Sequence, residues 1–391
     1  MEIEMVESLF WISVATIIYT YLAFPGLLFL RGRIWRCPVK RGLSMPTVSI
    51  IIVAHNEAAH IGRKLENLLA LNYPRDLLNI IVASDGSEDG TNEIVSQYES
   101  KGIRLLALPR RGKIPTLNAA AFNATGEILV FSDANSMYAP RAIRALVRPF
   151  ADPSVGGVAG SQCYVKDLDG SSTSLGEQAY WNFDQRLKQW QSQAGSVTSA
   201  TGAIYAIRRE LFQPVPSGVG DDAVISYQVV ARHYRMVFEP TAFAYEPVAP
   251  SSSAEFQRKV RICVRGLRGL LAVPELFNPL RYGFYSLQLF SHKLLRWLMV
   301  WPLMALFLSS LWLASGGWFY EIAAFLQAVF YGLAFSVFLV RRRKIGTAKI
   351  FKLLSLPFYF CLANSAFLLA QLRVVQGQRI ELWEVRRSEH S

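Results

Sequence analysis

The sequence predicts an α/β domain that is flanked by membrane-spanning helices. Three observations support this prediction: short apolar runs alternate with helical patterns between residues 46 and 250, one long apolar stretch precedes this region, and three more follow it. Alternating strand and helix signals are typical of a mostly parallel sheet covered by helices. The hydrophobic fraction of 52% exceeds what a soluble enzyme of 391 residues needs, so part of the chain is expected in lipid.

The net charge and the cysteine spacing limit which partners and which kinds of site are expected. The net charge of +12 would suit nucleic acid or an anionic membrane surface, and the apolar stretches favour the membrane and its lipids. The sequence contains no recognisable DNA-binding or RNA-binding motif, so we expect no nucleic-acid partner. The four cysteines form no CxxC pair, which argues against a zinc site or a disulfide framework.

The first element is predicted to be an uncleaved membrane anchor. Residues 9–30 are mostly apolar and are long enough to span a bilayer. Acidic residues precede this stretch and basic residues follow it, which is not the pattern of a signal peptide. By the positive-inside rule the N-terminus faces outward and the next domain is cytoplasmic. We assign residues 1–45 to this anchor and its basic linker.

Four short apolar runs predict the buried strands of the α/β domain, and helical patterns lie between them. The runs cover residues 48–53, 79–83, 103–108 and 128–131. The helical patterns comprise an apolar face of Ile61, Leu65, Leu68 and Leu69, residues 89–99, and residues 116–123.

Polar side chains follow three of these strands at the point where each strand ends. The sequence reads AHNE after the first, SDGS after the second and SDANS after the fourth. Because ligands of open α/β sheets bind outside the carboxyl ends of the strands, we expect a nucleotide pocket there. Asp133 and Asn135 would point the same way in an extended segment and could offer oxygen ligands to Mg²⁺ or Mn²⁺. Helix capping by these two residues is the alternative.

Two later segments also carry candidate functional residues. Asp221 and Asp222 follow a Pro- and Gly-rich loop and open a helix. Adjacent carboxylates raise each other's pKa and suit a general base, while simple N-capping is the alternative. Residues 254–273 predict a basic amphipathic helix at the membrane surface. Its basic stripe consists of Arg258, Arg261, Arg265 and Arg268.

Three further apolar stretches are predicted to span the membrane. They are residues 291–314, 317–340 and 351–370. The basic run at residues 341–344 is expected in the cytoplasm, in agreement with a count of spans from the anchor. The same count of spans places the C-terminal tail outside the cell, whereas the arginines of the tail favour the cytoplasm. An interfacial or re-entrant segment within residues 276–289 would resolve this conflict.

Taken in order, AHNE, SDGS, a GK before a helix, SDAN, GDD and RKVRI resemble the membrane-embedded family 2 glycosyltransferases. That family includes cellulose, chitin, hyaluronan and poly-N-acetylglucosamine synthases, and the resemblance covers nearly the whole chain. It implies an integral protein of a bacterial inner or plasma membrane with a cytoplasmic α/β domain of the Rossmann-like GT-A fold. The implied segments are the GT-A domain at 46–250, interfacial helices at 251–290, transmembrane helices at 291–372 and a tail at 373–391.

The resemblance also implies roles for individual residues in binding a UDP-sugar donor. Residues of the first two strand ends would hold uracil and ribose, and basic residues would hold the diphosphate. The donor-binding set is Asn56, Glu57, Asp85, Lys113, Arg258 and Arg261. Asp133 and Asn135 would be the metal ligands, with an amide in place of the family's second acid and correspondingly weaker metal binding.

On the acceptor side, the resemblance makes Asp222 the catalytic base, with Asp221 beside it. Gly202 would lie next to the terminal sugar of the acceptor, where a glycine permits close approach of the backbone. Arg258 and Ile262 depart from the family, which has glutamine and tryptophan at these positions. In processive relatives that tryptophan would stack on the acceptor, so Ile262 leaves the acceptor open between a carbohydrate and a lipid-linked one.

The predicted function is therefore that of an inverting, metal-dependent hexosyl- or N-acetylhexosaminyltransferase. It would build a β-linked polysaccharide at the membrane, and its helices could form an export path. Two alternatives stay open. One is transfer of a single sugar to a lipid or glycolipid, which Ile262 favours, and the other is a non-catalytic export or scaffold subunit, which Asn135 and Ile262 favour. Partner subunits and oligomeric state cannot be inferred from the sequence.

Overall fold

The computed structural model describes residues 2–165, 175–247, 252–342 and 350–379. The chain divides into two compact units. Among the described residues, the α/β unit comprises 28–165, 175–247, 265–287 and 379, and the helical unit comprises 2–27, 252–264, 288–342 and 350–378. Arg343 and Lys344 of the predicted basic run lie outside the described residues. The five predicted segments of the chain stay a prediction.

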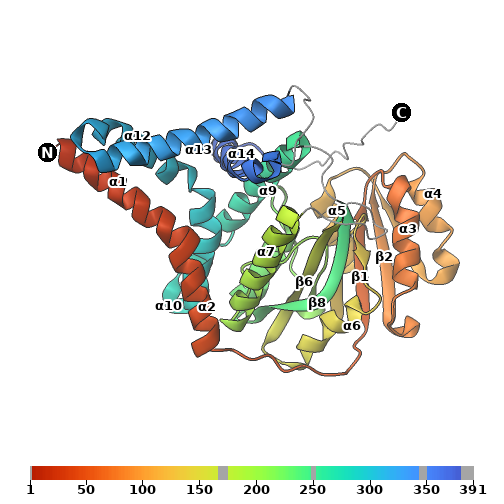
Figure 1. The fold of residues 1–391 in the computed structure, drawn as a ribbon. Helices are drawn as coiled ribbons and strands as arrows, with labels where there is room; N and C mark the ends of the chain where they lie inside the picture. The colour runs from red at the N-terminus through yellow and green to blue at the C-terminus, as the bar shows by residue number, and fades with distance from the viewer. Residues whose placement is uncertain (1, 166–174, 248–251, 343–349, 380–391) are drawn as a thin grey trace. The chain divides into compact units, whose positions relative to one another are not determined.

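The described part of the α/β unit contains an eight-stranded sheet with the order β3-β2-β1-β4-β7-β6-β8-β5 (Figure 1). Strands β1 to β4 pair in parallel, β7 runs antiparallel between β4 and β6, and the short β5 pairs antiparallel with β8. The strands are β1 (Val48–Ala54), β2 (Leu78–Asp85), β3 (Ile103–Leu108), β4 (Ile128–Asp133), β5 (Met137–Tyr138), β6 (Val155–Val165), β7 (Tyr205–Arg208) and β8 (Arg235–Pro247). The four strands predicted from apolar runs are thus confirmed as β1 to β4.

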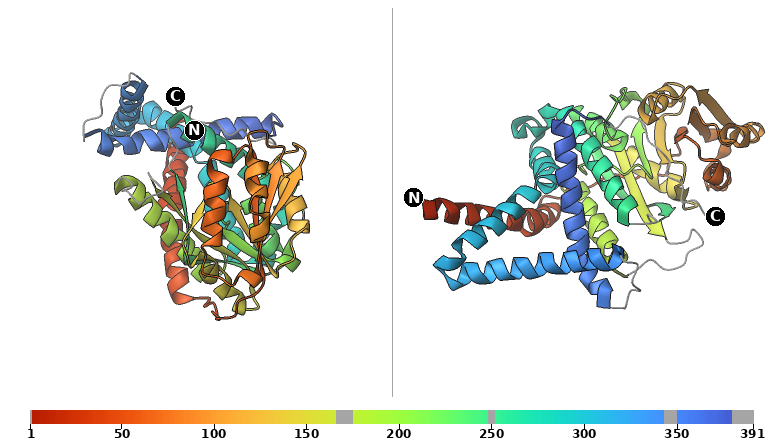
Figure 2. Two further views of the ribbon diagram at one scale, coloured as in Figure 1. Left: turned by 90° about the vertical axis from the view of Figure 1, so that its right-hand side faces the viewer. Right: turned by 90° about the horizontal axis from the view of Figure 1, so that it is seen from above.

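Helices cover both faces of this sheet (Figure 2). They are α3 (Ala58–Leu69), α4 (Thr91–Ser96), α5 (Lys113–Phe122), α6 (Ala142–Val147), α7 (Leu175–Gln193) and α8 (Asp221–Ala231). All seven residues of β1 are buried, as expected for a central strand of a parallel sheet with two covered faces. On one face, Ile61, Leu65 and Leu68 of α3 pack into the main hydrophobic core. The predicted helix at 116–123 begins earlier, at Lys113.

The parallel pairing brings the three polar strand ends to one edge of the sheet. Ala54 of β1 pairs with Ser84 of β2, and Val53 of β1 pairs with Asp133 of β4. The segments AHNE, SDGS and SDANS therefore leave adjacent strands side by side. This follows directly from the strand order, because parallel neighbours end in the same direction.

The N-terminal helix consists of α1 (Glu2–Ile18), a π-helical turn (Tyr19–Ala23) and α2 (Phe24–Ile34). Together they form a helix of 33 residues, longer than the predicted span at 9–30. The later helices of the helical unit are α12 (Val300–Leu313), α13 (Trp318–Arg342) and α14 (Ile350–Val375). Within the described residues, three helices are long and apolar enough to cross a membrane: Glu2–Ile34, Trp318–Val340 and Leu356–Val375.

The predicted span at 291–314 is not one continuous helix, and it stays a prediction. Two helical segments, Phe284–Leu295 and Val300–Gly316, meet there at a bend of 60°. Pro302 accounts for the break, because it has no N–H to donate to the carbonyl of Leu298 and its ring crowds that preceding turn. The bent pair is a broken span or a re-entrant loop.

The predicted amphipathic helix is confirmed as α9 (Ser252–Leu271). Its apolar face is buried, and it includes Val260, Cys263, Leu267 and Leu270. The arginine side chains beside this face are half-buried rather than fully exposed. Its predicted position at a membrane surface stays a prediction.

Candidate active site

Asp85, at the end of β2, is fully buried and organises the segment that precedes α5. Its carboxylate accepts hydrogen bonds from the backbone N–H groups of Arg111 (2.7 Å) and Gly112 (3.0 Å) and from the hydroxyl of Thr116 (3.1 Å). It also forms an ion pair of 2.6 Å with Arg110. Contact between Asp85 and a nucleoside stays a prediction.

Asn56 and Glu57 tie the end of β1 to the loop after β2. Asn56 has a φ of 55°, a left-handed conformation that asparagine tolerates well. Its side-chain carbonyl accepts the N–H of Glu88 (2.9 Å), and the N–H of Glu57 donates to the hydroxyl of Thr91 (2.9 Å). The two loops are therefore cross-linked where the nucleoside is predicted to bind, and the contacts of these residues with uracil and ribose stay predictions.

Lys113 lies at the centre of the candidate site, at the first turn of α5. Its ammonium is 3.1 Å from Oδ1 of Asp133 at the end of β4 and 3.3 Å from Oδ2 of Asp221 at the start of α8. Burial disfavours the charged amine, but the negative charges of Asp133, Asp221 and Asp222 outweigh it and raise the pKa of Lys113 above its ordinary value. The site thus has a permanently charged cation between two carboxylates from different elements.

A small cleft contains this cluster. Its polar lining includes Lys113, Asp133, Gly202 and Asp221, and Phe131 contributes to its apolar wall. A methyl group added at Gly202 would lie 3.1 Å from Oδ2 of Asp133, closer than side chains normally approach. The backbone at Gly202 therefore lies close to the Asp133 carboxylate. The role of Gly202 on the acceptor side stays a prediction.

The two adjacent acids at the start of α8 have different surroundings. Asp221 is buried and its carboxylate contacts Lys113. Asp222 is half-buried, and its Oδ1 accepts the backbone N–H of Ala223 at 2.9 Å. The sequence alone did not separate these two environments. The assignment of the catalytic base to Asp222 stays a prediction.

Two buried tyrosines near these acids were not identified from the sequence. Tyr205 of β7 and Tyr227 of α8 are fully buried, and within the described residues neither hydroxyl has a hydrogen-bond partner. Desolvation and the charges of Asp221 and Asp222 raise the pKa of Tyr205, and desolvation and Asp222 do the same for Tyr227. Both hydroxyls therefore stay protonated and able to donate. In the sequence they read as ordinary core residues of a strand and a helix.

The predicted metal ligands fit a metal that arrives with a nucleotide. The described residues contain no group of three or more His, Cys, Asp or Glu side chains that could hold a metal ion. Asp133 and Asn135 are both partly accessible at the end of β4, and their oxygens are of the hard type that Mg²⁺ and Mn²⁺ bind. One carboxylate and one amide leave most of the coordination shell to diphosphate oxygens and water.

The predicted residues of α9 belong to the helical unit. Arg258 forms an ion pair of 3.0 Å with Glu255 on the same helix. The side chain of Arg261 is half-buried, and that of Ile262 is 52% exposed. Their predicted contacts with the diphosphate and the acceptor stay predictions.

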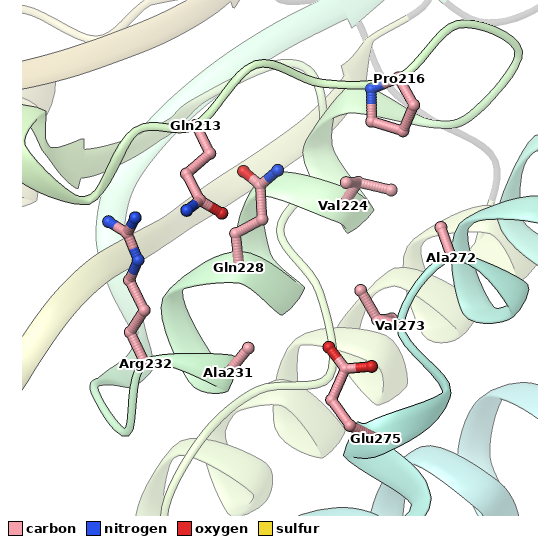
Figure 3. Close-up of a pocket in the computed structure, with 9 residues that line it drawn as sticks. All are labelled: Gln213, Pro216, Val224, Gln228, Ala231, Arg232, Ala272, Val273 and Glu275. Atoms are coloured by element: carbon pink, nitrogen blue, oxygen red, sulfur yellow. The ribbon is translucent and has the colours of Figure 1, made fainter.

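A larger cavity of about 280 Å³ lies elsewhere in the α/β unit (Figure 3). Gln228 of α8 and Arg232, which follows that helix, line it together with Gln213 and Glu275. None of the site residues predicted from the sequence lines this cavity. The candidate active site is therefore identified by its cluster of charged groups and not by the size of its cleft.

Known glycosyltransferases are similar to part of this chain. Residues 49–215 match the family described as glycosyl transferase family 2. The chain carries a family 2 glycosyltransferase domain. It is 27% identical over 228 residues to a probable glycosyltransferase, YdaM, of Bacillus subtilis, covering 54% of this chain and 52% of that protein. It is 25% identical over 234 residues to the poly-beta-1,6-N-acetyl-D-glucosamine synthase of Staphylococcus aureus, covering 57% and 55%.

The chain thus spans about half the length of these two curated relatives. A solved structure matches over a larger share: the mannosyltransferase PcManGT from Pyrobaculum calidifontis, in complex with GDP-Man and Mn²⁺. Its TM-score is 0.72 with 22% identity, covering 95% of this chain and 100% of that chain. The predicted GT-A fold is confirmed.

Proposed function

We propose that this protein is a membrane-anchored, inverting glycosyltransferase that builds a β-linked polysaccharide from a UDP-sugar. The observation that carries the proposal is the contact of Lys113 with both Asp133 and Asp221 at the carboxyl end of the sheet. This cluster combines a cation for a diphosphate, an acid for a metal and a neighbouring pair of acids for proton transfer. The family 2 match and the named synthase relative support the same activity.

In this mechanism each group of the cluster has one task. The ammonium of Lys113 attracts the diphosphate as a point charge. Asp133 and Asn135 would hold Mg²⁺ or Mn²⁺, which would stabilise the charge that develops on the departing nucleoside diphosphate. Asp222 accepts the proton of the acceptor hydroxyl while that oxygen bonds to the anomeric carbon, and the bond from this carbon to the diphosphate breaks on the opposite side.

The location in the membrane is part of the proposal. Three helices are long and apolar enough to span a bilayer, and the α/β unit follows the first of them. The basic residues after that helix favour a cytoplasmic domain, where nucleotide sugars are available. We propose the bacterial inner or plasma membrane and a carbohydrate acceptor.

A second candidate is transfer of one sugar to a lipid-linked acceptor. Ile262 favours it, because an exposed isoleucine cannot provide the flat stacking surface that tryptophan offers to a sugar. The archaeal mannosyltransferase, whose fold matches almost the whole chain, is a further reason to include GDP-mannose among the donors to be tested. The scaffold alternative is disfavoured by the intact cluster around Lys113.

The test is release of the nucleoside diphosphate by the full chain, purified in detergent, with Mn²⁺ or Mg²⁺ and a panel of UDP-sugars and GDP-mannose. The assay includes membrane lipid and oligosaccharide acceptors. We expect turnover with one donor and a loss of about 100-fold or more in Asp222→Asn. Asp221→Asn is the matched variant, because it removes the carboxylate of the adjacent, buried acid and leaves Asp222 in place.

Each outcome has a definite meaning. If none of the donors releases its nucleoside diphosphate, the result would contradict glycosyl transfer and favour the scaffold alternative. Full activity of Asp222→Asn together with an inactive Asp221→Asn would move the base to Asp221. The length of the product then separates the two enzyme candidates, since a product that stops after one added sugar excludes the polymerase.

A further inference from the structure

Lys64 is a fully buried lysine on the apolar face of α3. It lies one helical turn from Ile61 and one turn from Leu68, so the helix directs it toward the sheet and not toward solvent. Burial lowers the pKa of Lys64 to about 7, although the charges of Asp133 and Glu246 oppose this shift. A buried amine is costly unless specific partners satisfy it. Its partners therefore indicate what it does.

The hydrogen bonds of Lys64 connect it to the end of β4 and the segment that follows. Its ammonium donates to the hydroxyl of Ser132 at 2.8 Å and to the carbonyl of Ser136. It also lies 3.9 Å from the centre of the Tyr138 ring. Ser132 and Ser136 are the two ends of the SDANS segment, and the predicted metal ligands Asp133 and Asn135 lie between them.

A buried acid contacts the same segment from β8. The hydroxyl of Ser136 donates to Oε1 of Glu246, and the amide of Gln162 on β6 donates to Oε2 at 2.5 Å. Glu246 and Ser136 are both buried. The segment is thus bound by a buried lysine on one element and a buried glutamate on another, and Ser136 is bonded to both.

We infer that Lys64 and Glu246 are positioning residues that fix Asp133 and Asn135 in the geometry needed to bind a divalent cation together with a diphosphate. This inference rests on the proposed function. The reason is that this ligand pair is weak. One carboxylate and one amide carry a single negative charge, so the free energy of metal binding is small and could not also order a loose segment. A loop ordered in advance avoids that cost, and outer contacts of this kind typically change metal affinity by about 10- to 100-fold.

The experiment measures binding of UDP, and of GDP in parallel, to the full chain by calorimetry over a series of Mn²⁺ concentrations. It compares the wild type with Lys64→Met, Glu246→Gln and the control Lys101→Met. Lys101 is a matched control because both side chains of its ion pair with Glu66 are exposed. Thermal unfolding is followed in the same samples.

We expect the Mn²⁺ concentration for half-maximal nucleotide binding to rise by about tenfold or more in Lys64→Met and Glu246→Gln, and not in Lys101→Met. Metal-free nucleotide binding should be unchanged in all variants. Ser132→Ala removes one contact of Lys64 with less disturbance, and its metal titration decides the question if Lys64→Met does not fold.

A purely structural role would lower the unfolding temperature and leave the metal dependence at the wild-type value, which would overturn the inference. An unchanged metal dependence in Ser132→Ala, when Lys64→Met does not fold, would overturn it as well. If the wild type itself binds neither nucleotide in the presence of Mn²⁺, the proposed function fails, and the inference fails with it. If the wild type binds nucleotide and the variants show the same metal dependence as the wild type, the inference is refuted and the proposed function is not.

Discussion

Replacing Lys113 by methionine tests the centre of the site, because it removes the charge and nearly preserves the volume of the side chain. At 3.1 and 3.3 Å, and with an effective dielectric constant of about 20, each attraction between the ammonium and a carboxylate is about 5 kcal/mol before desolvation is considered. Desolvation of the amine offsets a large part of this. Solvent screens the contact with Asp133, whose side chain is 37% exposed, more than that with Asp221, which is 9% exposed.

The net loss of folding free energy in Lys113→Met should therefore lie between the cost of breaking a buried pair and that of breaking an exposed one. We expect about 2–3 kcal/mol, because one contact is buried and the other is partly screened. For a unit of this size, this corresponds to a decrease of roughly 5 °C or more in Tm. The variant also leaves Asp133 and Asp221 without the cation between them.

The assay is thermal unfolding of the full chain in detergent, followed by intrinsic fluorescence. Lys101→Met is the control, and its Tm should stay near the wild-type value because both partners of that ion pair are exposed. Asp221→Asn should recover part of the loss in the Lys113→Met background, since it removes one of the two unpaired charges. A Tm of Lys113→Met equal to that of the wild type would refute the idea that Lys113 holds the acids together.

Three further predictions follow from the same cluster. Gly202→Ala should reduce metal-dependent nucleotide binding several-fold with little change in Tm, because its methyl group would crowd Oδ2 of Asp133 at 3.1 Å; calorimetry checks this. Asn135→Asp should lower the half-saturating Mn²⁺ concentration, because it adds a carboxylate to the ligand pair; an unchanged metal titration would exclude residue 135 as a ligand. The folded-state pKa of Lys113 is raised above its unfolded value, so its stabilising effect is fully present below about pH 10 and is lost only at higher pH. The Tm difference between the wild type and Lys113→Met should thus be the same at about pH 6 and about pH 9, and a difference that shrinks over this range would contradict the raised pKa.

Much of the fold was predictable from local patterns. The apolar runs that became β1, β2 and β4 are short, bounded by polar residues and largely buried on both faces, so their sequence signal is strong. The run that became β3, at the edge of the sheet, is only partly buried. The start of α8 at Asp221 also has a local signal, because acids are favoured in the first turn of a helix. The break before α12 also has a local signal in the sequence, which is Pro302. A prediction from mean hydropathy misses this signal, because a single proline changes little in the average over a long apolar stretch.

Lys64 illustrates a signal that was present but not used. Its spacing from Ile61 and Leu68 places a charged residue on the apolar face of α3, which is unusual for a lysine. The sequence cannot name its partners, because Ser136 and Glu246 come from other elements and are brought to it only by the packing of α3 and β8 against the sheet.

The sequence by itself therefore determined four of the eight strands of the described sheet, the polar ends of three of them and the edge at which those ends meet. These properties depend on local periodicity and on the rule that parallel neighbours end in the same direction. The tertiary structure alone decided that Lys113 bridges Asp133 and Asp221, that the backbone at Gly202 lies close to Asp133 and that Lys64 and Glu246 hold the SDANS segment. Such contacts join residues far apart in the chain, and they exist only because close packing fits those side chains into one small volume.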